Sequence, residues 1–163
     1  FLLQALQHAL PLRPDLLLVI AGEGPARTEL QQQVARMQLQ DSVQFIGYLE
    51  RERELPACYA AADVFAFASL TETQGLVLLE AMAAGTPVIA LAEMGTADIL
   101  DAAPCAIVPP ADPAAFGQQL GELFTKPQRL DRLRQQAHAY ANAWSDSAMA
   151  GKLARLYRSL AEA

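Results

Sequence analysis

Short apolar runs alternate with segments of helical spacing along most of this chain, and this alternation constrains the fold more than any other feature. A continuous apolar run bounded by turn residues is typical of a strand covered on both faces. Such strands alternating with helices predict an α/β domain with a doubly wound parallel sheet. Right-handed crossovers would gather the loops at the carboxyl ends of the strands. The runs lie at 16–21, 43–46, 63–68, 87–91 and 105–108.

Helices are expected between these strands and after the last one. Pro25 lies near the first helical position of a segment from about 26 to 38, and Asp112-Pro113 offers a cap and an N1 proline. The aromatic side chains after residue 112 have the spacing of core packing rather than of a ligand platform. Other helices are expected at 1–10, 54–62 and 127–144, with one opened by Gly75 and one capped by Ser145 whose core face would be Leu153, Leu156, Tyr157 and Leu160.

The beginning of the chain is unusual for this fold class. Residues 1–10 already have helical spacing, with Leu3, Leu6 and Leu10 on one stripe, and no strand precedes them. A parallel sheet built from strand–helix–strand units normally begins with a strand. We therefore expect a single domain, residues 1–163, that is a fragment with its first strand missing and with a helical C-terminal extension.

Composition and charge exclude several functional classes. The 163 residues are 53% hydrophobic and 18% charged, which is enough apolar material for one sizeable core. The net charge of −6, without a basic stripe, argues against nucleic-acid binding. The apolar runs are too short to cross a bilayer, and Cys58 and Cys105 have neither zinc-site nor redox-motif spacing. A cytoplasmic protein with buried free thiols is expected.

The segment 71–89 contains the most specific chemistry. Glu72 and Glu80 lie eight residues apart around Gly75, which opens an apolar helix that is followed by Gly-Thr-Pro and a β-branched strand. A helix N-terminus suits phosphate, and ionised carboxylates accept hydrogen bonds from hydroxyls. A phosphate flanked by two sets of hydroxyls describes a nucleotide sugar. Each glutamate has a plainer alternative, since Glu72 could cap a helix and Glu80 could be a solvated helix residue.

The same segment resembles the E-x7-E segment of the retaining glycosyltransferases of group 1 (family 4), which have the two-domain GT-B architecture. Further marks of that family are Gly22-Glu23-Gly24-Pro25, Phe45-Ile46-Gly47-Tyr48 and the stretch from Ala60 to Phe65. The resemblance covers the C-terminal, nucleotide-sugar-binding half. It implies a Rossmann-like half of a GT-B fold, an absent N-terminal acceptor domain, and an absent first strand that would carry an Arg and a Lys against the donor diphosphate.

The resemblance also implies roles for particular residues. Glu80 would accept hydrogen bonds from the ribose hydroxyls, and Glu72, the candidate catalytic residue, would contact the transferred sugar without acting as a nucleophile. Backbone groups of Gly75 and Leu76 would face the sugar and diphosphate. The other candidate donor-binding residues are Thr73, Gln74, Gly22, Gly24, Tyr48 and Leu49.

Some of these assignments have structural alternatives. Gly22 and Gly24 could form a simple strand–helix turn, and Tyr48 could be a surface aromatic. The loop at 93–96 has Met94 where relatives often have glycine, so no phosphate role is assigned to it. No Asp-x-Asp element or His/Cys cluster suggests a metal or cofactor.

The function expected from the resemblance is transfer of a hexose from a nucleotide-diphosphate sugar to an acceptor with retention, in polysaccharide or glycolipid biosynthesis. The expected partners are the nucleotide sugar, the missing N-terminal domain in cis, and the inner face of a membrane for peripheral association. The fragment alone should be inactive. Alternatives are a catalytically silent nucleotide-sugar-binding module, a GT-B-type sugar-nucleotide epimerase, and a dinucleotide oxidoreductase, although no dinucleotide fingerprint is present.

Overall fold

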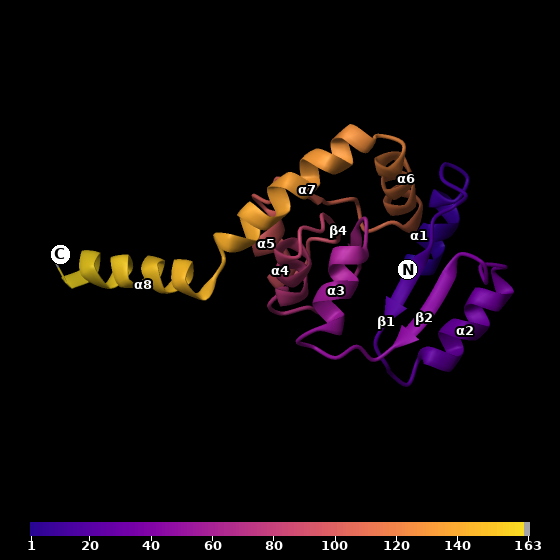
Figure 1. Ribbon diagram of the computed structural model, residues 1–163, viewed down its shortest axis with the longest axis horizontal. Helices are drawn as coiled ribbons and strands as arrows, with labels where there is room; N and C mark the ends of the chain where they lie inside the picture. The colour runs from indigo at the N-terminus through magenta and orange to yellow at the C-terminus, as the bar shows by residue number, and fades with distance from the viewer. Residues whose placement is uncertain (162–163) are drawn as a thin grey trace.

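The computed structural model describes residues 1–161 and confirms the α/β class (Figure 1). Each of the five expected apolar runs contains a strand: β1 (Leu18–Ala21), β2 (Val43–Gly47), β3 (Phe65–Phe67), β4 (Val88–Ala90) and β5 (Ala106–Ile107). The helices are α1 (Leu2–Ala9), α2 (Arg27–Arg36), α3 (Glu54–Ala61), α4 (Leu76–Ala83), α5 (Gly95–Leu100), α6 (Pro113–Phe124), α7 (Pro127–Asn142) and α8 (Asp146–Ala161).

The strands form two parallel sheets, which corrects the expectation of one. β1 pairs with β2, and β3, β4 and β5 pair in that order. Within the described residues no strand pairing joins β1 to β3. The physical reason is that an apolar cavity separates the facing edges of β1 and β3.

The core lies around the second sheet and its helices. The strand β4 is fully buried, as predicted, between α4 with α7 on one side and α6 on the other. The strand β1 is different, because burial alternates along it: Leu17 is 53% exposed and Val19 43% exposed. The expectation that 16–21 is covered on both faces is therefore wrong, since α1 and α2 cover the face with Leu16, Leu18 and Ile20 and leave the opposite face exposed.

Helices α1 and α6 connect the two sheets through an unusually close contact. A Cβ added at Gly117 would lie 2.1 Å from the backbone oxygen of Ala5, so the two helix backbones approach more closely than any side chain allows. A Cβ added at Gly121 would lie 2.9 Å from the Leu12 side chain and 3.1 Å from the Ala9 carbonyl, which is a less severe clash. The first residue joins this contact, because the Phe1 ring packs edge-on against a buried phenylalanine of α6, Phe116, at 5.5 Å.

The helix boundaries confirm some predictions and correct others. Asp112 caps α6 by accepting a hydrogen bond from the Ala115 amide at 2.8 Å, with proline at the first helical position. Pro25 instead lies two residues before α2, and α5 was not foreseen.

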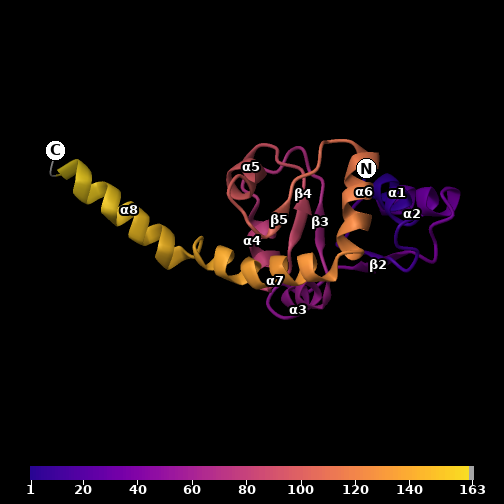
Figure 2. The same cartoon turned by 90° about the horizontal axis from the view of Figure 1, so that it is seen from above.

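The C-terminal helix α8 departs most from expectation. It projects away from the body of the molecule in both views (Figures 1 and 2). No residue of α8 within the described part is buried, so the expected core face is wrong. The side chains of that face are instead between 50% and 66% exposed: Leu153, Leu156, Tyr157 and Leu160. No described helix is both long and apolar enough to cross a membrane.

Candidate functional site

Backbone hydrogen bonds link the carboxyl ends of β1 and β2 to each other, and the loops after β3 and β4 to each other. The Gly22 amide donates to the Gly47 carbonyl at 2.6 Å, which joins the ends of β1 and β2. The Gly95 amide donates to the Glu72 carbonyl at 3.1 Å, which joins the loops after β3 and β4. All these strands are parallel within their sheets, so the loops lie at carboxyl ends, where ligands of open α/β sheets bind.

Glu72 holds the loop that enters α4. Its Oε1 accepts hydrogen bonds from the Gln74 and Gly75 amides, both at 3.0 Å. These backbone donors favour the ionised form and lower the pKa of Glu72 below its ordinary value. The capping alternative for Glu72 therefore describes part of its role. Oε2 has no hydrogen bond among the described residues, so one oxygen remains for a ligand.

Gly75 has a conformation and a setting that require glycine. Its φ is +69°, and a Cβ there would lie 2.9 Å from Ile99 Cδ1 and 3.3 Å from the Gly95 carbonyl. Gly95 is equally constrained, because a Cβ on it would meet the Thr73 carbonyl at 2.1 Å. The loop 71–75 thus packs directly against the loop 93–96.

The loop 93–96 is held in place by the buried hydroxyl of Thr96. Thr96 Oγ1 lies 2.9 Å from the Leu91 carbonyl and 2.7 Å from the Glu93 carbonyl, and it accepts from the Glu93 amide at 2.9 Å. Met94 in the same loop has φ 50° and ψ −126°, a conformation that glycine adopts most easily. A glycine at this position would adopt the same conformation without the steric cost that the Met94 Cβ brings.

Glu80 lies on α4 between a cation and a phenol. Arg51 Nη2 donates to Glu80 Oε1 at 3.3 Å, and the Tyr59 hydroxyl donates to Glu80 Oε2 at 3.5 Å. Burial is the main reason that the pKa of Tyr59 is raised to about 12, and the negative charge of Glu80 adds to it. The phenol is therefore a neutral donor at physiological pH. Both contacts to Glu80 are long, so its oxygens retain capacity to accept from a ligand.

Gly22, Gly24, Tyr48 and Leu49 surround a neighbouring part of the same edge. Gly22 has φ +112°, and a Cβ at Gly24 would meet nothing within 4 Å, so this turn is open. Tyr48 is 70% exposed and Leu49 is partly buried. Arg51, three residues after Tyr48, brings this loop to Glu80.

The first turn of α4 offers free backbone donors. The amides of Leu76 and Val77 make no hydrogen bond among the described residues, whereas the Gly75 amide is already used by Glu72. In this structure the Gly75 amide is engaged by the Glu72 carboxylate, so the role of its N–H toward a ligand stays a prediction. In residues 1–161, no three His, Cys, Asp or Glu side chains converge to hold a metal.

Comparison with known families agrees with this geometry. The family model described as glycosyl transferases group 1 matches residues 1–140. The chain belongs to this family. The resemblance of the 71–89 segment is thereby confirmed, and so is the fold, the Rossmann-like half of a GT-B architecture.

Relatives in this family are considerably longer. The chain is 34% identical over 142 residues to a D-inositol 3-phosphate glycosyltransferase of Corynebacterium urealyticum, covering 86% of this chain and 33% of that protein. It is 30% identical over 166 residues to a GDP-mannose-dependent monoacylated alpha-(1-6)-phosphatidylinositol monomannoside mannosyltransferase of Corynebacterium glutamicum, covering 97% of this chain and 43% of that protein. This chain therefore spans less than half the length of these relatives.

A solved structure supports the fold independently. The pneumococcal O-GlcNAc transferase GtfA superposes with a TM-score of 0.79 at 22% identity, over 99% of this chain and 33% of its own. At that identity the likeness establishes the fold alone.

The sequence predicted Glu72, Gln74, Gly75 and Glu80 as candidate residues, but it did not predict two side chains that contact Glu80. Glu72, Gln74 and Gly75 are in direct contact, and Glu80 lies further along the helix that they open. Arg51 and Tyr59 were not foreseen, because they reach Glu80 across 29 and 21 positions of sequence. The signal that could have suggested Arg51 is its position just after the Tyr48 loop.

Proposed function

We propose that this chain is the donor-binding half of a retaining glycosyltransferase that transfers a hexose from a nucleotide-diphosphate sugar. The observation that carries this proposal is the Glu72–Gly75–Glu80 arrangement, in which two carboxylates flank a helix start with free amides. The family match supports it, as does the GtfA structure, which was solved in complex with UDP and GlcNAc.

Each feature of the site would meet a different part of the donor. Glu80 would accept from the ribose hydroxyls, and Arg51 beside it would balance the charge of the carboxylate. The Leu76 and Val77 amides would donate to the diphosphate at the positive end of the α4 dipole. Donors fixed where the leaving diphosphate gains charge stabilise the transition state. The free Oε2 of Glu72 would accept from a sugar hydroxyl.

Replacing Glu80 by glutamine tests the ribose contact. A hydrogen bond to a charged group contributes roughly 1.5–3 kcal/mol, so Glu80→Gln should weaken nucleotide binding about tenfold or more. Calorimetric titration with UDP, GDP and ADP measures the effect. Glu122→Gln on α6 is the matched control, since it removes the same charge from a surface helix and should not change binding. A large loss of melting temperature in Glu80→Gln with unchanged affinity would identify Glu80 as a structural residue instead.

The 163-residue chain should bind nucleotide weakly and transfer no sugar. The proposed reason is that acceptor recognition and the basic groups that clamp the diphosphate belong to a preceding N-terminal domain, in a cytoplasmic protein associated with the inner face of a membrane. Sugar transfer is measured as the radiolabel that passes from labelled UDP-glucose or GDP-mannose to endogenous lipid. Sustained turnover by the 163-residue chain would contradict the proposal.

A further inference from the structure

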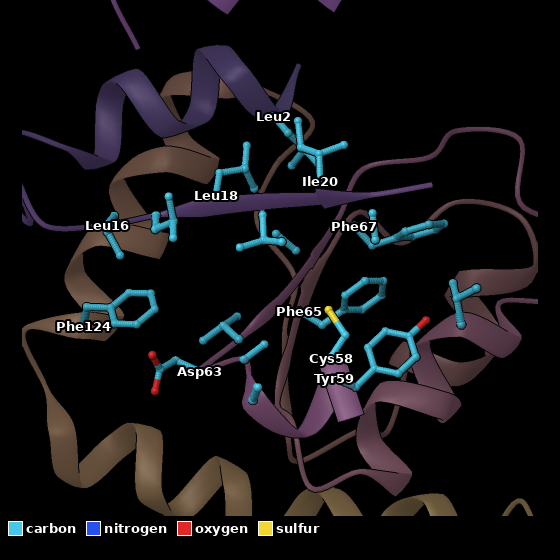
Figure 3. A pocket seen from close by; sticks show the side chains of 18 of the residues that line it. Leu2, Leu16, Leu18, Ile20, Cys58, Tyr59, Asp63, Phe65, Phe67 and Phe124 are labelled. Atoms are coloured by element: carbon cyan, nitrogen blue, oxygen red, sulfur yellow. The ribbon is translucent and has the colours of Figure 1, made fainter. Parts of the chain in front are cut away.

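One buried polar group of this fold points at the candidate site, the hydroxyl of Tyr59. This residue lies in the last turn of α3, and its hydroxyl donates to Glu80 Oε2 at 3.5 Å. Among the described residues, Glu80 is the only hydrogen-bond partner of the phenol. Figure 3 shows the Tyr59 ring beside Phe65, with the hydroxyl pointing away from the cavity between the sheets. A buried phenol needs a partner, and here that partner belongs to the candidate site.

The position of Tyr59 is fixed by contacts that do not involve Glu80. Its ring packs edge-on against Phe65 of β3, with ring centroids 5.2 Å apart. Its carbonyl accepts a hydrogen bond from the Thr86 hydroxyl at 2.6 Å, and Thr86 is buried just before β4. The phenol is therefore a fixed point toward which the Glu80 side chain is held.

Glu80 has a second partner, which holds the carboxylate less firmly. The Arg51 side chain is 78% exposed, and its guanidinium lies 3.3 Å from Glu80 Oε1. An exposed ion pair of this kind contributes little, because water and salt screen it. The Tyr59 hydroxyl is inside the protein, where burial, with the charge of Glu80 adding to it, raises the pKa of Tyr59 to about 12. The phenol therefore stays a neutral donor to Glu80 throughout the neutral pH range.

The two contacts leave Glu80 able to accept a pair of hydroxyls. An ionised carboxylate has about four lone-pair sites, shared by its two oxygens. Tyr59 uses one site on Oε2 and Arg51 uses one on Oε1, so about one remains free on each oxygen. A ligand that donates from two neighbouring hydroxyls matches this arrangement.

A carboxylate that is already in place binds such a ligand more tightly than a mobile one. A glutamate side chain has several rotatable bonds, and a ligand that must order them loses part of its binding free energy. Restricting Glu80 before the ligand arrives reduces that loss. The plainer role for the Tyr59 hydroxyl is to find a partner within the core, which would affect stability and leave ligand binding unchanged.

We propose that Tyr59 is a positioning residue of the donor site, which holds the Glu80 carboxylate so that each of its oxygens accepts one ribose hydroxyl. This inference rests on the proposed function, in which Glu80 accepts from these hydroxyls. Tyr59 acts through Glu80 and does not itself touch the nucleotide.

Tyr59→Phe tests this, because it removes the hydroxyl and keeps the ring against Phe65. The matched control is Tyr140→Phe, because the Tyr140 hydroxyl donates to the Ile99 carbonyl at 2.6 Å and its ring packs against the same core cluster. The probes for calorimetric titration are UDP, GDP and ADP, each compared with its 2′,3′-dideoxy form.

The expected result separates the ribose contact from stability. Tyr59→Phe should weaken binding of the nucleotide that the wild type binds by about threefold to tenfold, the range that one hydrogen bond supplies. Affinity for the dideoxy form, which has no ribose hydroxyls to offer, should not change. Tyr140→Phe should change neither affinity, although its lost hydrogen bond should lower the melting temperature.

Two further readouts show whether Tyr59 acts through Glu80. In a Glu80→Ala background, Tyr59→Phe should weaken nucleotide binding no further, because there is no carboxylate left to hold. Without any ligand, three-bond NMR couplings in the chain labelled with carbon-13 glutamate report the rotamer of the Glu80 side chain. The wild type and Tyr140→Phe should show a single rotamer, and Tyr59→Phe should show averaging among several.

Three results would overturn the proposal. One is unchanged nucleotide affinity in Tyr59→Phe together with a lower melting temperature, which would make the hydroxyl a structural group. Another is an equal loss of affinity for a nucleotide and its dideoxy form, which would mean that the effect does not pass through the ribose contact. The third is a single Glu80 rotamer in Tyr59→Phe. If the wild type binds none of the nucleotides, the proposed function fails, and the couplings alone then decide whether Tyr59 holds Glu80.

Discussion

Glu72 couples the shape of the loop before α4 to pH. The Gln74 and Gly75 amides bind its ionised form and lower its pKa in the folded chain from the ordinary value of 4.5. Because the folded pKa is lowered, the unfolded chain takes up the proton first as pH falls. The stability that the ionised group contributes is therefore present at neutral pH and lost as pH falls below about 4.5 and through the folded pKa.

Glu72→Gln should remove this acid-dependent part of the stability. The variant should be less stable than the wild type at pH 7, and the difference should shrink toward pH 3. Urea unfolding of both proteins at pH 7, 5, 4 and 3 measures it. Asp41→Asn, at an exposed position outside the helices, is the control for loss of a carboxylate. A constant difference between wild type and Glu72→Gln across this range would show that the amide contacts do not depend on the charge.

The sequence predicted the part of the candidate site in which the contacts join residues that are close in sequence. Glu72, Gln74 and Gly75 lie within four positions, so their contacts follow from the helix start that the sequence predicts. Met94 is the opposite case, because its glycine-like φ and ψ are imposed by the loop that Thr96 anchors. The Arg51–Glu80 contact could not be foreseen either, since it depends on how two separate loops meet in space.

At the scale of elements, the contact between α1 and α6 offers a sharp test. Alanine is a better helix former than glycine by about 1 kcal/mol, so Gly117→Ala would stabilise α6 if space allowed. The Ala5 carbonyl at 2.1 Å from the added Cβ excludes this. We therefore expect a net loss of about 1–3 kcal/mol in the free energy of unfolding, measured by urea denaturation.

Gly151→Ala is the matched control for that substitution. Gly151 lies in α8, where an added Cβ would approach only the end of the Arg155 side chain at 3.6 Å. This variant should raise the helical signal in circular dichroism slightly and leave the unfolding midpoint unchanged. Equal behaviour of the two variants would mean that α1 and α6 separate easily.

The order of elements was predictable from hydrophobic pattern, but their assembly into sheets was not. Each apolar run became a strand because it is short, uninterrupted and bounded by turn residues. The hydrophobic pattern could not show that β1 pairs with a strand on one edge only and leaves Val19 partly exposed. That outcome depends on which strand edges meet.

At the scale of the whole molecule, the body and the C-terminal helix are energetically separate. The helix α7 packs on α4 and buries Leu130, Leu133, Ala137 and Ala141. By contrast, α8 buries none of its described residues. Its contact with the rest includes a Lys152 ammonium 5.6 Å from the Trp144 ring, a cation–π pair worth about 0.5–1 kcal/mol at an exposed site.

Two truncations should therefore behave very differently. A chain of residues 1–144 should unfold at nearly the same temperature as 1–163, because it loses almost no buried surface, and it should aggregate less because the apolar side chains of α8 are gone. A chain of residues 1–126 should unfold well below both, because removing α7 exposes the apolar surface of α4. Differential scanning calorimetry with light scattering measures both effects. A midpoint for 1–144 that falls by more than a few degrees would mean that α8 packs on the body in solution, against its position in Figures 1 and 2.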